Sequence, residues 1–225
     1  MAAGMTYSQR EETDRSWTHV AVVRHGETDW NVNHRIQGHH PVELNARGKA
    51  QALAAADRLA DQAIDAIYSS DLVRAMRTAE VIAARHGMPP IPDDRLREWS
   101  LGVLEGLLSE EAKARYPNVY EAFRVEDPDF LIPGGASIRE RYTRSTEAVA
   151  EIAEKHAGGR VMVVTHGGVL DDLYRRTTGM ALDAKKDFKI YNGGINEIRI
   201  AGDVWEIVTW GEIGHLEGIG SLGEW

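Results

Sequence analysis

The sequence predicts an α/β fold in three layers, with a mostly parallel central sheet and helices on both of its faces. Short apolar runs rich in valine alternate along the chain with long amphipathic stretches, which is typical of strands joined by covering helices. Two of these runs precede a His–Gly pair: the run at 160–165 is followed by it directly, and the run at 19–23 after one residue. Continuous apolar runs of this kind indicate strands buried on both sides, and the ligand of such a sheet lies at the carboxyl ends of its strands.

The first half of the chain is expected to contribute two strands and two helices. In order, these are a strand at 19–23, a helix from 46 to about 62, a strand at 64–68 and a helix from about 72 to 86. Asn45 is a suitable N-cap for the first helix and Ser69–Ser70–Asp71 for the second, which Gly87 and Pro89 then stop. The apolar face expected for the first helix consists of Leu53, Ala56, Leu59 and Ala60.

The second half continues the alternation after a less regular middle. Residues 93–135 show weak periodicity and contain two short helical stretches near 110–115 and 119–125. The elements expected after them are a long helix at about 137–156, a strand at 160–165, a helix at 170–178, and two strands at 195–200 and 204–209 that form a hairpin. We therefore expect one domain over residues 17–210, between a flexible tail at 1–16 and a glycine-rich tail at 211–225.

Composition excludes several classes of function. The chain has 225 residues, with 26 lysines and arginines against 35 aspartates and glutamates, a formal charge of −9 and no cysteine. Without cysteine there is no disulfide framework, no thiolate catalysis and no thiolate-bound metal. The negative charge argues against nucleic acid as a partner, and no apolar window approaches the ~18 residues of a membrane span. The charged first residues do not fit a secretory signal, so we expect a cytoplasmic protein with no membrane partner.

The ends of the two buried strands carry the residue types of an anion site. His25 and His166 each precede a glycine, which lets a ligand approach the main chain, and Arg24 supplies a planar fork suited to phosphate. Arg74 lies in the first turn of a helix that follows another strand. A lone histidine is usually a core or surface residue without a chemical role, but two in matching strand–His–Gly contexts weaken that interpretation. The residues therefore predict a pocket that binds a small anion.

These residues resemble the signature of the histidine phosphatase superfamily, also called the phosphoglycerate mutase-like fold. The first match is Arg24-His25-Gly26-Glu27-Thr28 with Trp30-Asn31. The further matches, in the order that the family has them, are Arg35-Ile36-Gln37-Gly38, Leu44-Asn45 with Gly48 and Gln51-Ala52, Ser69-Ser70-Asp71-Leu72 with Arg74-Ala75 and Thr78-Ala79, Leu96-Arg97-Glu98 with Gly102 and Glu105-Gly106, Pro133-Gly134-Gly135, and Val164-Thr165-His166-Gly167-Gly168-Val169-Leu170. The resemblance covers about residues 18–200, and a long signature with ordered companions is far more specific than a single short motif.

The resemblance implies a phosphoryl-transfer site and assigns roles to its residues. His25 would be the nucleophile that forms a phosphohistidine, and Glu98 would be the acid that protonates the leaving group and then the base that activates water. The groups that would hold the phosphate are Arg24, Asn31, Arg74, His166 and the backbone amide of Gly167. Gln37 and Gly38 are candidate substrate contacts. The family needs no metal and no other cofactor for this chemistry, and it implies a homodimer by habit, although no residue here shows one.

Several residues near these motifs have alternative interpretations. Glu105 is a second candidate for the acid. His39–His40 suggests a metal site, but adjacent histidines without a third spaced ligand are more often loop residues, and a substrate contact is another alternative. Glu27 and Thr28 are expected to fix the loop around His25. The glycine-rich C-terminal segment is either flexible or packed, and in relatives it can close over the site.

Three features favour a phosphatase over a phosphoglycerate mutase. Only about sixty residues separate Gly106 from His166, whereas mutases carry a sizeable extra segment there. Mutases tend to have asparagine where Gly168 stands, and their Arg–Arg pair and lysine for the second phosphate have no convincing counterpart. We expect a metal-independent phosphomonoesterase whose partner is a small phosphorylated metabolite of the sugar phosphate, phosphoserine or phosphoglycerate type. The alternatives are a bisphosphoglycerate-dependent mutase and a catalytically silent binding member of the fold.

Departures from the family pattern concern the substrate rather than the phosphate site. Ala136 replaces the glutamate usual after Pro-Gly-Gly, Pro41–Val42 stand where an aspartate is common, and Asp171–Asp172 replace a frequent basic residue. Asp171 and Glu43 are expected near the mouth of the pocket, where their charge would repel a multiply charged substrate or attract an amino group. These residues do not name the substrate.

Overall fold

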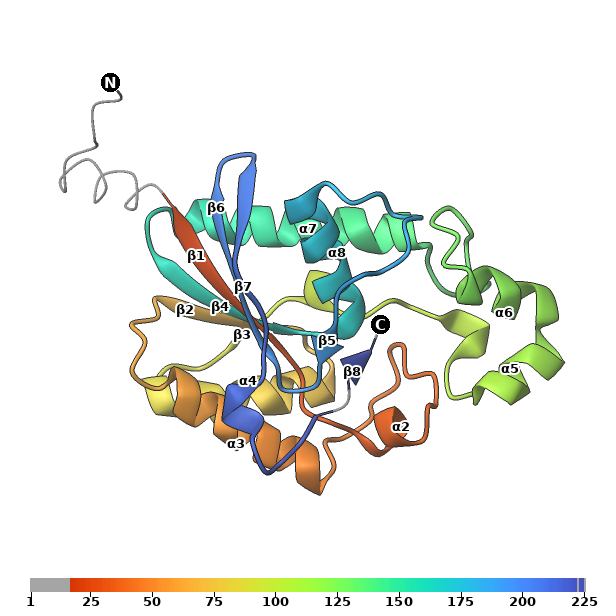
Figure 1. Cartoon of the computed structure of the whole chain (residues 1–225), viewed down its shortest axis with the longest axis horizontal. Coiled ribbons are helices and arrows are strands. Elements are labelled where there is room, and N and C mark those ends of the chain that lie inside the picture. Colours follow the sequence, from red (N-terminus) through yellow and green to blue (C-terminus); the bar gives the residue numbers. More distant parts are fainter. Residues whose placement is uncertain (1–16, 222, 225) are drawn as a thin grey trace.

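A six-stranded sheet lies between two layers of helices in the computed structural model, which describes residues 17–221, 223 and 224 (Figure 1). The strands follow the order β3-β2-β4-β1-β6-β7. Their bounds are Thr18–Arg24 for β1, Ala66–Ser69 for β2, Ile91–Pro92 for β3, Arg160–Thr165 for β4, Ile195–Ala201 for β6 and Val204–Glu212 for β7. Strands β3, β2, β4 and β1 are parallel to one another, whereas β6 runs antiparallel to β1 and β7 antiparallel to β6, so the sheet is mostly parallel as expected.

The pairing of β1 with β4 positions the two His–Gly motifs. His19 pairs with Arg160 at one end of the two strands, and Arg24 pairs with Thr165 at the other. The two strands therefore end at the same level of the sheet. His25 and His166 follow directly, at the same carboxyl edge, which is where the sequence places the ligand site.

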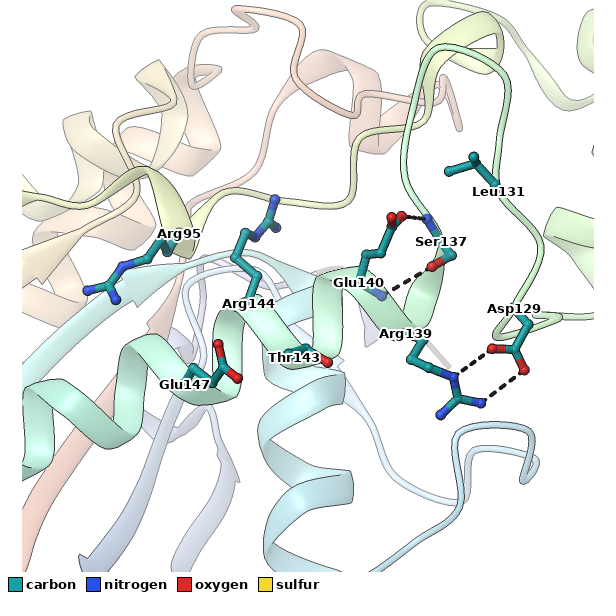
Figure 2. A pocket seen from close by; sticks show the side chains of 9 residues that line it. All are labelled: Arg95, Asp129, Leu131, Ser137, Arg139, Glu140, Thr143, Arg144 and Glu147. Atoms are coloured by element: carbon teal, nitrogen blue, oxygen red, sulfur yellow. Dashed lines mark hydrogen bonds and ion pairs between the residues drawn. The ribbon is translucent and has the colours of Figure 1, made fainter.

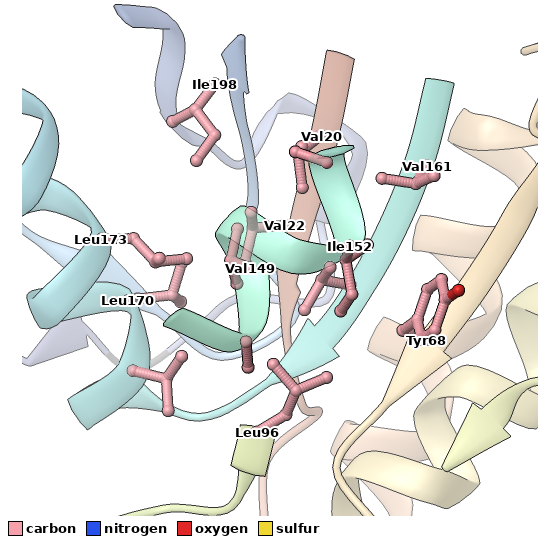
Figure 3. Close-up of a cluster of buried hydrophobic side chains, with 14 of the residues drawn as sticks. Val20, Val22, Tyr68, Leu96, Val149, Ile152, Val161, Leu170, Leu173 and Ile198 are labelled. Carbon is pink, nitrogen blue, oxygen red and sulfur yellow. The ribbon is translucent and has the colours of Figure 1, made fainter. Parts of the chain in front are cut away.

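Alternation along the central strands divides the core between the two helix layers. The helices are α2 Asp29–Val32, α3 Ala46–Leu59, α4 Val73–His86, α5 Ser109–Arg115, α6 Pro117–Arg124, α7 Ile138–Lys155 and α8 Gly167–Thr178. Val20 and Val22 pack with α7 and α8 side chains such as Val149 and Leu170 (Figure 3), whereas Ala21 and Val23 pack against α3 and α4. Both faces of β1 are thus covered, which explains its continuous apolar sequence.

The buried face of α3 differs from the one expected. It consists of Gly48, Gln51, Ala52, Ala55, Ala56 and Leu59, while Leu53 is 51% exposed and Ala60 lies beyond the last helical residue. Ala55, Ala56 and Leu59 share a core cluster with three buried alanines of α4, namely Ala75, Ala79 and Ala83. Alanines allow the two helices to approach closely, so their packing, rather than the size of Leu53, decides which side of α3 is buried.

Two helices near the site begin elsewhere than expected. The N-cap of α4 is Leu72, without a side-chain hydrogen bond, because Ser70 Oγ instead accepts from the Leu72 amide to close the preceding turn. Helix α8 begins at Gly167, with His166 as its N-cap, and not at Leu170. Gly167 and Gly168 therefore belong to the first turn of α8, and the amide of Gly167 lies at a helix N-terminus.

Residues 94–136 form a separate lobe that carries α5 and α6 and lies beside the carboxyl edge of the sheet (Figure 1). A small apolar cluster lies within the lobe and consists of Trp99, Leu101, Leu104, Ala112 and Ile132. Ile36 and Ile138 join this cluster from the neighbouring segments. It provides one wall of the site described below.

The glycine-rich C-terminal segment is packed over its described part. It begins within β7, and its residues Gly214–Leu216 form a short 3-10 helix. Gln51 Nε2 then donates to the Gly220 carbonyl over 2.8 Å, and strand β8 (Gly223–Glu224) pairs antiparallel with β5 (Ile190–Tyr191). The tail expected at 1–16 lies outside the described residues, as do residues 222 and 225. Among the described residues, no helix is both long and apolar enough to span a membrane.

Candidate active site

A cleft of about 530 Å³ opens at the carboxyl edge of the sheet, between the strand ends and the lobe of residues 94–136. Most residues expected at the site line this cleft: Arg24, His25, Asn31, Gln37, Gly38, Arg74, Glu98 and Gly167. His166 is fully buried beside it, with its ring centroid 5.1 Å from that of His25. The structure therefore brings together the residues that the sequence predicts to react with or hold the phosphate.

The hydrogen bonds of His25 determine its tautomer. Its Nδ1 lies 2.7 Å from the Gly26 carbonyl oxygen, which can only accept, so Nδ1 carries the proton. Arg74 Nε donates to His25 Nε2 over 3.3 Å, so Nε2 carries the lone pair. Burial, followed by the positive charges of Arg74 and Arg24, lowers the pKa of His25 well below its usual value. The imidazole is consequently neutral at neutral pH, with a lone pair on the nitrogen next to the arginine.

Gly26 is required by the close approach of α3 to this loop. A Cβ at this position would lie 2.3 Å from the Gly48 carbonyl oxygen, closer than any real contact of that kind. The loop is also held by Glu27, whose carboxylate accepts from Asn45 and Arg47, and by Thr28, which caps α2. Both residues thus fix the loop, as the sequence predicts.

His166 is a second neutral imidazole. Its Nε2 lies 2.8 Å from Ser70 Oγ, and its Nδ1 is buried without a hydrogen-bond partner among the described residues. Burial and then the positive charges of Arg74 and Arg24 lower the pKa of His166 well below its usual value. A buried nitrogen without a partner is costly unless a ligand satisfies it.

The two arginines of the site are almost completely buried. Arg74 Nη2 donates to the Gly38 carbonyl over 2.8 Å and Nη1 to that of His40 over 3.1 Å, while Arg24 Nη1 donates to the Ile190 carbonyl over 3.3 Å. These contacts hold both guanidinium groups near His25, where their positive charge contributes to its low pKa. Positive groups held in a buried cleft favour an anion such as a phosphate.

Glu98 lines the cleft, and backbone amides hold its carboxylate in place. Its Oε1 accepts from Trp99 N over 2.8 Å and from Gly168 N over 3.1 Å. A Cβ at Gly168 would lie only 2.2 Å from Oε1, so the glycine makes room for this carboxylate. The backbone of Glu98 is fixed from behind, because Arg144 donates to the carbonyls of Arg97 and Glu98.

Other candidate residues have structural partners. Glu105 does not line the cleft, and its Oε1 accepts from the amides of His39 and Leu101, which argues against the role of acid. The His39 ring bonds to the Glu98 carbonyl and His40 lies against Trp30. Among the described residues, no group of three His, Cys, Asp or Glu side chains could hold a metal ion.

Asn31 and Gln37 are tied to the loop that surrounds His25. Asn31 Oδ1 accepts from the Thr28 amide and hydroxyl, and Gln37 Oε1 also accepts from the Thr28 hydroxyl, over 3.2 Å. Asn192 Nδ2 donates to the His25 carbonyl over 3.1 Å. Both expected residues line the cleft, and Thr28 and Asn192 fix their surroundings.

Asp171 lines the cleft, where the sequence places it, but its charge is paired inside the protein and does not have the expected effect on a substrate. The side chain of Asp171 is 5% exposed, and its carboxylate pairs with Arg175 over 2.9 Å and with Arg141 over 3.3 Å. These arginines neutralise its charge inside the protein. Glu43, by contrast, is exposed.

Four residues contribute to the site although the sequence analysis predicts no role at the site for them. Ser70 directly follows β2 at the same sheet edge, so the rule that found the histidines could have found it. Arg141 and Arg144 lie inside α7 and Asn192 follows β5, and no local pattern marks these three. Their roles depend on which distant elements pack together.

A second hollow of about 580 Å³ lies on the outer side of α7 (Figure 2). Its charged groups include an ion pair between Arg139 and Asp129, and none of the residues expected at the site lines it. Figure 2 shows Arg144 extending from α7 toward the segment that contains Glu98, whose carbonyl it contacts. The chemistry predicted from the sequence thus belongs to the cleft at the sheet edge.

Several known proteins are similar to this chain in sequence and in fold. Residues 20–213 match the model of the histidine phosphatase superfamily (branch 1). The chain is 45% identical to phosphoglycerate mutase-like protein 4 of Arabidopsis thaliana over 222 residues, covering 97% of this chain and 95% of that protein. It is 39% identical over 221 residues to a metal-independent phosphoserine phosphatase of the same organism, covering 96% and 90%. The solved structure of Bacillus stearothermophilus YhfR has a TM-score of 0.83 at 31% identity, over 88% of this chain and 99% of that one.

Proposed function

The chain belongs to the histidine phosphatase superfamily, and on that premise we propose that it is a metal-independent phosphomonoesterase acting on small phosphorylated metabolites. Membership of this family and the named relatives support a phosphatase or mutase activity. The observation that carries the proposal of a phosphomonoesterase is the lone pair of His25 Nε2, which is held beside Arg74 in the cleft. It is an unprotonated nucleophile next to a binding site for phosphate.

In the first half-reaction, His25 Nε2 attacks phosphorus in line with the ester oxygen. The N–P bond forms as the P–O bond breaks, and the leaving alkoxide takes a proton from Glu98. Arg24 and Arg74 stabilise the charge on the equatorial phosphoryl oxygens, and the Gly167 amide at the start of α8 adds a donor and a helix N-terminus. His166 Nδ1 would gain its missing partner from the same phosphoryl group.

In the second half-reaction, Glu98 accepts a proton from water, which attacks the phosphohistidine. The O–P bond to water forms as the N–P bond breaks, so that inorganic phosphate and neutral His25 are restored. Positioning and charge supply the catalysis, as is usual for phosphoryl transfer. The shortness of the segment between Gly106 and His166 favours water over a second substrate molecule as the acceptor.

The proposal is tested by phosphate release from p-nitrophenyl phosphate in the presence of a chelator, with wild type and His25→Ala. We expect release by the wild type, none by the variant, and an acid-labile phosphoryl group on His25 after rapid quenching. His19→Ala is the matched control, because His19 lies at the opposite end of the same strand and pairs with Glu197. Undiminished release by His25→Ala would refute the mechanism.

A mutase is the second candidate, because the relative with 45% identity is named for its likeness to phosphoglycerate mutases. A coupled assay with 3-phosphoglycerate, with and without bisphosphoglycerate, separates the two activities. If isomerisation outruns phosphate release, the chain is a mutase. A catalytically silent binding protein would give neither activity and no phosphohistidine.

A further inference from the structure

We propose that Arg141 binds a carboxylate on the leaving group of the substrate, so that the enzyme prefers phosphate esters of hydroxy acids. This inference rests on the proposed phosphatase function and adds the substrate class to it. It is carried by the one nitrogen of a buried guanidinium that bonds to none of the residues the structure describes.

Arg141 is a buried cation in the wall of the cleft. Its side chain is 5% exposed, yet it contributes to the lining. Nε and Nη2 each donate to the Asp172 carboxylate over 2.9 Å, and Nη2 also approaches Asp171 at 3.3 Å. No described residue accepts a hydrogen bond from Nη1. The guanidinium is thus held through Nε and Nη2, and Nη1 is the nitrogen that can bond to a ligand in the cleft.

The position of Nη1 relates it to the reacting bond. A Cβ at Gly168 would lie 2.8 Å from Arg141 Nη1 and 2.2 Å from Glu98 Oε1, so both atoms border the same small volume of the cleft. Glu98 is the proposed donor of the proton to the ester oxygen. A group that bonds to Nη1 therefore lies beside Glu98, on the leaving-group side of the reacting bond.

The surroundings of the guanidinium restrict how a ligand can approach. The ring of Trp99 covers one face, with the Arg141 Cζ 5.4 Å from the ring centroid, and Asp172 occupies the edge formed by Nε and Nη2. What remains is approach in the plane of the fork toward Nη1. Carboxylate oxygens bond arginine in this plane, and the bond is charge-assisted and stronger than one to a neutral hydroxyl.

The cluster around Arg141 does not repel an incoming anion. Asp171 is also paired with Arg175, over 2.9 Å, and it lies 3.8 Å from Lys186 Nζ, while Lys186 bonds to Glu126 over 2.8 Å. Arg141, Arg175 and Lys186 therefore balance the carboxylates of Asp171, Asp172 and Glu126, and Glu98, the proposed acid, is a further carboxyl group beside the guanidinium. Asp172, followed by Asp171 and Glu98, outweighs the effect of burial and raises the pKa of Arg141, so its positive charge is permanent.

The experiment compares esters that differ only in the carboxylate: O-phosphoserine against O-phosphoethanolamine, and 3-phosphoglycerate against glycerol 3-phosphate. The test variant is Arg141→Met combined with Asp172→Asn, because Arg141→Met alone would leave Asp172 buried without its partner. Asp172→Asn alone is the matched control, since it keeps Arg141. Thermal unfolding of both variants verifies that they fold, and p-nitrophenyl phosphate reports phosphatase activity without a carboxylate on the substrate.

We expect kcat/KM of the wild type and of Asp172→Asn to favour the carboxylate ester of each pair by roughly 10- to 100-fold, the range of one charge-assisted hydrogen bond. The double variant should lose most of that ratio. The inference is overturned if the wild type shows no preference or if the folded double variant keeps it. If p-nitrophenyl phosphate is not hydrolysed even by the wild type, the phosphatase function fails first and the inference with it.

Discussion

Arg74 donates a hydrogen bond from Nε to Nε2 of His25 over 3.3 Å, and its other two nitrogens bond to the carbonyls of Gly38 and His40. One side chain thus orients the lone pair of His25 and also holds the loop that borders the cleft. Three donors in one plane are needed for this arrangement, which an ammonium group cannot reproduce.

We therefore expect Arg74→Lys to lower kcat/KM for p-nitrophenyl phosphate by roughly 100- to 1,000-fold, the cost of removing one preorganised donor from such a site. The charge is kept, so the loss would measure geometry rather than electrostatics alone. Arg77→Lys is the control, because Arg77 lies on the same helix but is exposed and paired with Glu80. Equal activities of the two variants would contradict the proposed role of Arg74.

Gly168→Ala tests the space that Glu98 occupies. The added Cβ would lie 2.2 Å from Glu98 Oε1, so the carboxylate must move although both backbone amides that bind it remain. We expect kcat to fall, and to fall more for esters with a strongly basic leaving alkoxide than for p-nitrophenyl phosphate, because only the former depend on proton donation. Gly214→Ala is the control, because nothing lies within 4 Å of its Cβ position. Equal losses for both kinds of ester would speak against Glu98 as the acid.

The part of the site at the strand ends follows from the sequence because each of its residues stands just after a strand, and the carboxyl ends of parallel strands share one edge of the sheet. His25 and His166 each follow a strand, β1 and β4 are neighbours in register, and the sheet itself brings the two rings together. The same holds for Arg74, which the turn after β2 places at that edge. Apolar runs and a strand-end rule were sufficient to predict this much.

The wall of the cleft could not be predicted in this way. Arg141 and Asp172 are 31 residues apart on different helices, and only the packing of α7 against α8 decides that they pair. The sequence predicts an acidic charge at Asp171 near the mouth of the pocket, whereas in the structure Arg175 and Arg141 neutralise that charge. Charge pairing across distant elements and the buried face of α3 both depend on tertiary contacts, which residue periodicity does not encode.

Arg144→Met tests whether the backbone of Glu98 needs its support from α7. Arg144 Nη2 bonds to the carbonyls of Arg97 and Glu98 over 2.5 and 3.2 Å, so its loss should misplace Glu98 in every complex. We expect kcat to fall by roughly 10-fold or more for all alkyl esters while KM changes little, because ground-state binding of the phosphate is left intact. Arg139→Met, on the same helix and paired with Asp129 at the surface (Figure 2), is the control. A rise in KM alone would contradict this positioning role.

The two neutral histidines make stability depend on pH. The folded-state pKa values of His25 and His166 lie well below 6.5, so near and below pH 6.5 the unfolded chain binds more protons than the folded one. Their contribution to stability is therefore complete above pH 6.5 and is lost as the pH falls toward the folded-state values. We expect the free energy of unfolding, from denaturant titrations between pH 7.5 and 5, to decrease by up to roughly 1 kcal/mol per pH unit for each histidine. The double variant His25→Gln, His166→Gln should show a shallower dependence, and identical slopes would mean that these histidines are not held neutral.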